Sequence, residues 1–219
     1  SAGSLADEEE DRFVLDAFAL VRQTRGCALL IAPRRLHRVP GLVREIESRG
    51  WTVSLRSATT KDSANAVNAN VASSDAANAD ATDINVTNVD AAKSVDVYVL
   101  DTMGELAVAY RFSQAAYVGG TLNSAGHNMA EPLYWGVPVS YGPSRGFFES
   151  VQKACEKAGV GFRVHSPQEL AAHWTDVLQH PQKREQWRQN ARKLLDEQGN
   201  AVERNVQQIR EVVDALTAS

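Results

Sequence analysis

The residues best suited to chemistry lie in one short segment that follows an apolar run. Gly119 and Gly120 would form a tight turn with exposed backbone amides, which suits a phosphate group. Glu131 offers two carboxylate oxygens, which match the two hydroxyls of a ribose. Asn128 is a natural helix N-cap, so Glu131 could instead complete a capping box. His127 fits either a ligand contact or simple packing.

A second segment, residues 101–106 with the sequence DTMGEL, also follows an apolar run. Gly104 would let the backbone approach a ligand closely. Asp101 or Thr102 could cap the helix that follows. Taken alone, the segment is better explained as a plain capped helix than as a binding site.

Arg34 follows another apolar run and could neutralise a phosphate or a sugar carboxylate, although a solvated basic turn explains it as well. Residues 142–145 are better explained as a turn. The sequence contains no P-loop, no cluster of Cys or His with metal-ligand spacing, no Gly-X-Ser-X-Gly elbow and no Asp-X-Asp pair. We therefore expect neither a metal nor a cofactor. The scattered histidines, among them His165 and His173, are interpreted as surface or packing residues.

Short apolar runs alternate with helical patterns along the chain. Strands are expected at residues 28–32, 51–55, 95–100, 115–118, 137–140 and 161–164, and helices at 7–25, 40–49, 104–112, 128–135, 147–158 and 167–179. This alternation predicts an α/β fold with a Rossmann-like, doubly wound and mostly parallel sheet. Ligands bind such sheets at the carboxyl ends of the strands, where the polar segments fall.

The chain of 219 residues is expected to form one domain, residues 1–219. Residues 57–93 contain no leucine and no aromatic residue, so we predict a disordered insertion there. Residues 181–219 are predicted to form C-terminal helices. The first residue is serine, so we expect the chain to be part of a longer protein.

The bulk composition excludes some classes of protein. The net charge of −4 provides no broad basic surface, which argues against a nucleic-acid partner. No apolar run approaches the roughly 18 residues of a membrane span. The two cysteines, Cys27 and Cys155, form no short-spaced motif and are interpreted as reduced thiols.

Taken in order, these segments resemble the C-terminal, donor-binding domain of the bacterial 3-deoxy-D-manno-octulosonic acid (Kdo) transferases. The most specific matches are DTMGEL at residues 101–106 and the pattern Gly-His-Asn-X-X-Glu-Pro at residues 126–132. Shorter matches lie at residues 2–4 with Glu8 and Glu9, at 31–34, 119–122, 136–139 and 142–143. The resemblance runs from residue 1 to about residue 177, leaving out the insertion.

The resemblance implies the C-terminal half of a GT-B glycosyltransferase, in which two Rossmann-like domains face each other across a cleft. It implies CMP-Kdo as the donor, a lipid A precursor as the acceptor, and metal-free transfer in lipopolysaccharide synthesis. It places the acceptor site, the general base and the membrane contact in an N-terminal domain that is absent here. The full-length protein would lie on the cytoplasmic side of the inner membrane. This chain alone would be soluble and would bind nucleotide without transferring sugar.

If the resemblance holds, we expect particular residues to bind the donor. Glu131 would hold the ribose, and Met103 would line the cytosine site. Amides near Gly104 and Asn128 would hold the phosphate, and Arg34 would face the phosphate or the Kdo carboxylate. The complete set of predicted substrate-binding residues is Gly3, Ser4, Arg34, Met103, Gly104, Glu105, Gly119, Gly120, His127, Asn128 and Glu131.

Two alternatives stay open at this point. The first is another GT-B enzyme, with a UDP-sugar donor or with sugar-nucleotide epimerase activity. The second is a non-catalytic nucleotide-binding module. The nucleotide that the chain prefers would separate the first alternative from a Kdo transferase.

Overall fold

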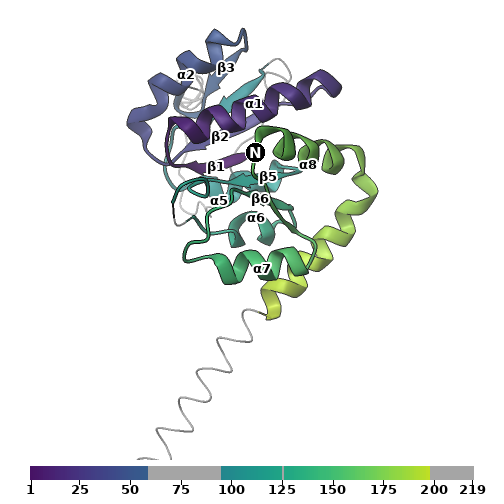
Figure 1. Ribbon diagram of the computed structural model, residues 1–219. Coiled ribbons are helices and arrows are strands. Elements are labelled where there is room, and N and C mark those ends of the chain that lie inside the picture. The colour runs from purple at the N-terminus through teal and green to yellow at the C-terminus, as the bar shows by residue number, and fades with distance from the viewer. Residues whose placement is uncertain (59–94, 125, 198–219) are drawn as a thin grey trace, which may run out of the picture.

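The computed structural model describes residues 1–58, 95–124 and 126–197 (Figure 1). Within these residues, seven strands form one sheet in the order β3-β4-β2-β1-β5-β6-β7. Every neighbouring pair in the sheet is parallel. Helices flank the sheet, as the ribbon diagram shows. The predicted α/β fold with a doubly wound parallel sheet is therefore confirmed.

The strands are short. Their bounds are β1 (Ala2–Leu5), β2 (Leu29–Pro33), β3 (Val53–Leu55), β4 (Val97–Val99), β5 (Ala116–Val118), β6 (Val139–Tyr141) and β7 (Gly161–Arg163). All residues of β5 and β6 are buried, as expected of strands covered on both faces. The strand β1 was not predicted, because Ala-Gly-Ser-Leu contains neither a β-branched nor an aromatic residue. It nevertheless lies at the centre of the sheet, paired with β2 and β5.

The helices also follow the predicted order. Their bounds are α1 (Glu8–Thr24), α2 (Val39–Ser48), α5 (Leu106–Ala109), α6 (Ala130–Tyr134), α7 (Glu149–Lys157) and α8 (Pro167–Gln179), with 3-10 turns η1 (Leu36–Arg38), η2 (Tyr110–Phe112) and η3 (Pro181–Lys183). Residues 184–197 form a further helix. The predicted insertion lies outside the described residues except for Ser57 and Ala58. The end of the predicted C-terminal helices, residues 198–219, also lies outside them.

Helix α1 covers the middle of the sheet and begins at a well-formed cap. The Asp7 side chain accepts a hydrogen bond of 2.9 Å from the amide of Glu10. Val14, Phe18 and Val21 are buried along one face of the helix, at the spacing of an amphipathic helix. Helix α8 packs along α1, so an element late in the chain lies beside the first helix.

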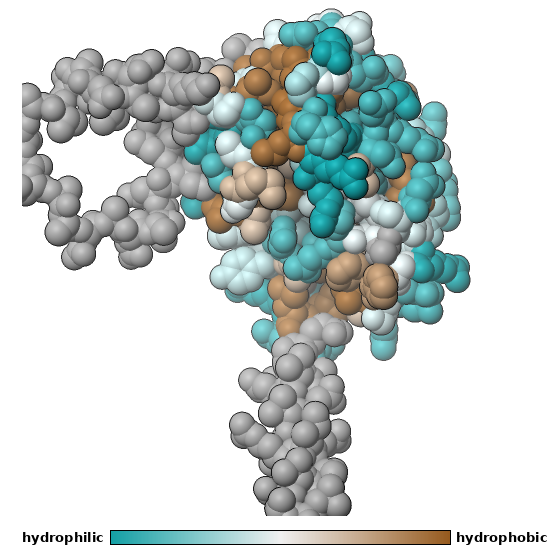
Figure 2. Space-filling model, turned by 90° about the vertical axis from the view of Figure 1, so that its left-hand side faces the viewer, coloured by the Kyte–Doolittle hydropathy of each residue, from teal (hydrophilic) through white to brown (hydrophobic). Residues whose placement is uncertain are grey.

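The order of the strands reverses between β1 and β5. The strands β2, β4 and β3 lie on one side of β1, and β5, β6 and β7 lie on the other. Loops that leave the carboxyl ends of the strands diverge at such a switch point and leave room for a ligand. These ends lie on the left of Figure 1, and that side faces the viewer in Figure 2. None of the helices in the described part of the chain is long and apolar enough to cross a membrane.

Candidate functional site

Two glycines at the carboxyl ends of β1 and β5 lie so close to neighbouring atoms that no other residue fits in their place. A Cβ atom on Gly119 would lie 2.6 Å from the carbonyl oxygen of Ser4, and one on Gly3 would collide with the hydroxyl of Tyr110. Ser4 itself has a φ of 60°, in the left-handed region that favours glycine. Among the described residues it is the one non-glycine residue with a positive φ, and strain of this kind gathers at ligand sites.

A buried carboxylate holds this switch point together. Glu10, in the first turn of α1, is only 1% exposed. It accepts hydrogen bonds from the amides of Ala6 (2.8 Å), Gly120 (2.7 Å) and Thr121 (3.1 Å), and from the hydroxyl of Tyr117 (3.0 Å). Sequence reasoning missed this residue, because an acidic first turn of a helix is fully explained by capping and the helix dipole.

The amides of the double glycine are therefore not exposed, and that expectation was wrong. The amide of Gly119 donates to the carbonyl of Gly3 at 2.8 Å, and the amide of Gly120 donates to Glu10. Gly120 has a φ of 68°, and a Cβ there would lie 2.6 Å from Nε2 of His127. Glycine is required at both positions for close packing rather than for a pair of free amides.

Arg34 and His127 meet across the switch point. The Arg34 Nη1 atom lies 3.0 Å from Nδ1 of His127, so the loop after β2 contacts the loop after β5. Burial and the neighbouring guanidinium lower the pKa of His127, which favours a neutral imidazole that can accept from Arg34. Arg34 is otherwise exposed to solvent, so its guanidinium can still contact an anion.

Glu131 lies half-buried in the first turn of α6. Burial raises the pKa of its carboxyl group. No hydrogen bond or ion pair in the described residues satisfies this carboxylate, so the capping-box alternative is wrong. The helix has Met129 at its N-cap, and the Asn128 side chain instead accepts from the amide of Ala130 at 3.0 Å. The Glu131 carboxylate is consequently available to a ligand.

The acidic residues of the segment 101–106 are engaged within the protein. Asp101 accepts hydrogen bonds from the amide of Ser57 (2.8 Å) and from its hydroxyl. Glu105 pairs with Arg56, with 2.7 Å between Oε2 and Nε. The expectation that Asp101 or Thr102 caps the next helix is wrong, since α5 has Glu105 at its N-cap with no side-chain bond. These two carboxylates tie the end of β4 to the chain that follows β3.

Two residues of the same segment remain accessible. Met103 is 75% exposed, and the exposed Gly104 has a φ of 85°. Leu36 and Phe147, which follow β2 and β6, are also exposed hydrophobic residues at this edge of the sheet. Figure 2 shows this side of the molecule, where hydrophobic patches are separated by hydrophilic side chains. No hydrogen bond or ion pair in the described residues joins Met103 or Gly104 to Arg34, His127 or Glu131.

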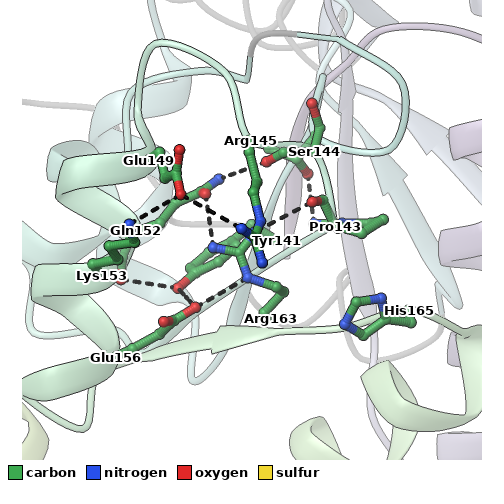
Figure 3. A network of polar contacts seen from close by, with 12 residues as sticks. Tyr141, Pro143, Ser144, Arg145, Glu149, Gln152, Lys153, Glu156, Arg163 and His165 are labelled. Atoms are coloured by element: carbon green, nitrogen blue, oxygen red, sulfur yellow. Dashed lines mark hydrogen bonds and ion pairs between the residues drawn. The ribbon is translucent and has the colours of Figure 1, made fainter.

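The loop after β6 borders the site and is held by a second polar network (Figure 3). Arg163, at the end of β7, donates to the carbonyl of Pro143 (3.3 Å), to Oε1 of Gln152 (3.0 Å) and to Oε1 of Glu156 (3.2 Å). The amide of Gly142 donates to the Thr121 hydroxyl at 2.8 Å, which links this loop to the one after β5. These hydrogen bonds thus hold the predicted turn at residues 142–145 in place beside the switch point.

The structure brings most of the predicted residues to one place. Gly3, Ser4, Gly119 and Gly120 form the floor of the switch point, and Arg34 contacts His127 above it. Burial, followed by the nearby charge of Glu131, raises the pKa of the Tyr110 hydroxyl, which lies against Gly3. Glu105 is not part of this group, because its carboxylate pairs with Arg56.

A doubly wound parallel sheet with polar loops at its switch point defines the class of Rossmann-like domains. No family model matches the chain. Its curated relatives include the 3-deoxy-D-manno-octulosonic acid transferase of Aquifex aeolicus, which is 40% identical over 84 residues, or 38% of this chain and 24% of that protein. The bifunctional glycosyltransferase/methyltransferase of Fusobacterium nucleatum is 29% identical over 162 residues, or 74% of this chain and 21% of that protein.

A second 3-deoxy-D-manno-octulosonic acid transferase, from Chlamydophila psittaci, is 28% identical over 123 residues, which is 55% of this chain and 28% of that protein. The chain thus aligns with only 21% to 28% of the length of these relatives. The resemblance to Kdo transferases that the motifs predicted is confirmed by these matches.

A solved structure confirms which part of such a protein the chain resembles. The C-terminal CMP-Kdo binding domain of WaaA from Acinetobacter baumannii matches with a TM-score of 0.67 and 24% identity, over 89% of each chain. The chain therefore has the fold of the C-terminal half of a GT-B glycosyltransferase.

Proposed function

We propose that this chain is the donor-binding domain of a Kdo transferase and that it binds CMP-Kdo at the switch point between β1 and β5. The observation that carries the proposal is the Glu131 carboxylate, which has no partner among the described residues. It lies four residues along the chain from His127, which contacts the cationic Arg34. The similarity to Kdo transferases and to a CMP-Kdo binding domain supports the same ligand.

Each group has a chemical task in this proposal. The two oxygens of Glu131 accept hydrogen bonds from the two ribose hydroxyls. Arg34 faces the phosphate or the sugar carboxylate, and it stabilises the negative charge that builds on the phosphate as CMP leaves. Loop amides near Gly104 and Asn128 add donors to the phosphate, and the exposed Met103 lines the base.

The remaining parts of the reaction are assigned to the longer protein. The acceptor is a lipid A precursor, and the reaction is a step of lipopolysaccharide synthesis on the cytoplasmic side of the inner membrane. The general base and the membrane contact lie in an N-terminal domain. The chain by itself consequently binds the donor but transfers no sugar.

Calorimetric titration of the chain with CMP and with UDP tests the proposal. CMP is expected to bind more tightly than UDP, and Glu131→Gln is expected to weaken CMP at least about tenfold, since a bond to a charged acceptor contributes about 1.5–3 kcal/mol. Glu47→Gln, on the exposed face of α2, is the control and leaves affinity unchanged. Preference for UDP would favour another GT-B enzyme, and no binding of CMP would contradict the proposal.

A further inference from the structure

We propose that Glu10 is a positioning residue of this site, which holds the loop after β5 in the conformation that the ligand meets. The inference rests on the proposed function, because it concerns the same switch point. Glu10 does not touch the ligand in this proposal. It acts through Gly120 and Thr121, and through them on His127 and Arg34.

The hydrogen bonds of Glu10 join two parts of the chain more than 100 residues apart. Its Oε2 atom accepts from the amides of Ala6 and Gly120, and its Oε1 atom accepts from the amide of Thr121 and the hydroxyl of Tyr117. The separation of Glu10 from Gly120 is 110 residues. One side chain therefore fixes the end of β1 relative to the end of β5.

Capping of α1 does not explain this arrangement. Asp7 already caps the helix by accepting from the amide of Glu10. Of the four hydrogen bonds to the Glu10 carboxylate, the bond from Ala6 alone is local to the helix start. The other three come from β5 and the loop that follows it. No Lys, Arg or His in the described residues forms an ion pair with Glu10, so these neutral donors must satisfy a charge that is almost fully buried.

A continuous set of contacts leads from Glu10 to the predicted ligand groups. Gly120 is held by Glu10, and its carbonyl accepts from the amide of Gly126 at 2.7 Å. The ring of His127 packs directly on Gly120, and Arg34 contacts that ring. The charge of Glu10 also acts on His127, where it opposes the effects of burial and of Arg34 on the pKa. A shift of Gly120 would therefore displace both His127 and Arg34.

Glu10→Gln is the sharpest test because glutamine has one acceptor oxygen where glutamate has two. Each carboxylate oxygen now faces two donors, at least one of which is a backbone amide. Whichever way the glutamine amide is oriented, its NH₂ group points at a backbone N–H. At least one of the bonds from Ala6, Gly120 and Thr121 is therefore lost.

Asp11→Asn provides the matched control. Asp11 is the next residue of the same helical turn, is also buried, and pairs with Arg38 rather than with the loop after β5. Both substitutions replace a buried carboxylate with an amide of nearly the same size. Glu10→Gln alone is expected to weaken CMP, by about tenfold or more, at a temperature where all proteins are folded.

Hydrogen exchange of the backbone amides, measured by NMR, provides a readout that does not depend on nucleotide. Exchange at Gly120 and Thr121 is expected to rise at least about tenfold in Glu10→Gln, relative to core amides of β6, and to stay unchanged in Asp11→Asn. Unchanged exchange at both amides would overturn the inference. So would CMP affinity within twofold of the wild-type chain.

A third variant and the wild-type titration complete the test. If Glu10→Gln does not fold, Glu10→Asp keeps the charge but shortens the reach, and it is judged by the same two criteria. If the wild-type chain binds no nucleotide, the proposed function fails. The exchange of Gly120 and Thr121 then still decides whether Glu10 holds the loop.

Discussion

Two glutamates of this domain show how burial separates a structural carboxylate from one that is available to a ligand. Glu10 is almost fully buried and accepts four hydrogen bonds from the protein. Glu131 is half-exposed and has no hydrogen-bond partner among the described residues. Burial raises the pKa of Glu131, but the group remains open enough to exchange water for ribose hydroxyls.

A histidine away from the site illustrates the effect of burial on a base. His173 lies with Nδ1 2.6 Å from the Ser140 hydroxyl, and its ring stacks on Phe162 with 3.8 Å between centroids. Burial lowers the pKa of His173 from 6.5 to about 4, against a small opposing effect of Asp176. The interpretation of this histidine as a packing residue agrees with its position.

His173 is expected to make the stability of the chain depend on pH. Its pKa is lower in the folded state, so the unfolded state binds the proton first as the pH falls from about 6.5 to 4, and stability is lost in that window. Between pH 7 and pH 5 the loss from this group is about 2 kcal/mol. Glutamine does not titrate, so His173→Gln should lack this loss. The free energy of unfolding, measured with urea at both pH values, checks the prediction.

The two proteins must be compared by the slope of their free energy of unfolding against pH, because Asp11 changes this free energy in the opposite direction. Burial raises the pKa of Asp11 to about 6, so this group adds stability as the pH falls through the same range. That contribution is the same in both proteins and cancels in the difference. Equal slopes for the wild-type chain and His173→Gln would contradict the prediction, and the exposed His165→Gln serves as the control.

At the scale of the elements, the site depends on close contacts between loops rather than on long helices. Helices α5 and α6 contain four and five residues, too few to be stable without tertiary contacts. The loop after β5 packs on the backbone of Ser4, and the loop after β6 packs on Thr121. The glycines at these crossings, Gly119 and Gly142, allow the loops to approach.

Gly119→Ala is expected to destabilise the chain by about 1–3 kcal/mol, as overpacking of a fixed structure does. Its Cβ would lie 2.6 Å from the Ser4 carbonyl oxygen and 2.7 Å from the Leu5 Cα atom, and neither backbone can move freely. Thermal and urea unfolding measure the effect. Gly26→Ala, which has nothing within 4 Å of its Cβ, should be neutral or slightly stabilising. Equal stability of the two variants would refute the close-approach explanation.

At the scale of the whole molecule, α8 packs against α1 and helps to cover one face of the sheet. This contact joins residues from the first and the last thirds of the chain across one face of the sheet. Leu170, Trp174 and Val177 of α8 are buried in the same core cluster as Phe18 and Val21 of α1. Most buried hydrophobic residues of the described part of the chain therefore belong to one core cluster, which includes both helices, and we expect these helices to unfold as one unit.

Leu170→Ala should lower the free energy of unfolding by about 2–5 kcal/mol, because it leaves a cavity in that core. The exposed Gln168→Ala, two residues earlier on the same helix, should change it by less than about 0.5 kcal/mol. Circular dichroism and tryptophan fluorescence should report the same transition in both proteins. Separate transitions for the two signals would show that α8 is not part of a single cooperative unit.

The sequence by itself determined the α/β class, six of the seven strands and the segments that meet at the carboxyl edge. These features depend on local patterns of apolar and polar residues, which a linear sequence displays directly. The motifs at residues 101–106 and 126–132 also indicated the family resemblance without any structure.

The tertiary structure decided what the sequence left open or gave wrongly. It made the weakly patterned β1 the central strand, used the Gly119 and Gly120 amides inside the protein, and paired Glu105 with Arg56. It also assigned Glu10 to the loop after β5. Each of these outcomes depends on a partner far away in the chain, and the hydrogen bonds of a buried group are chosen by the fold rather than by its neighbours in sequence.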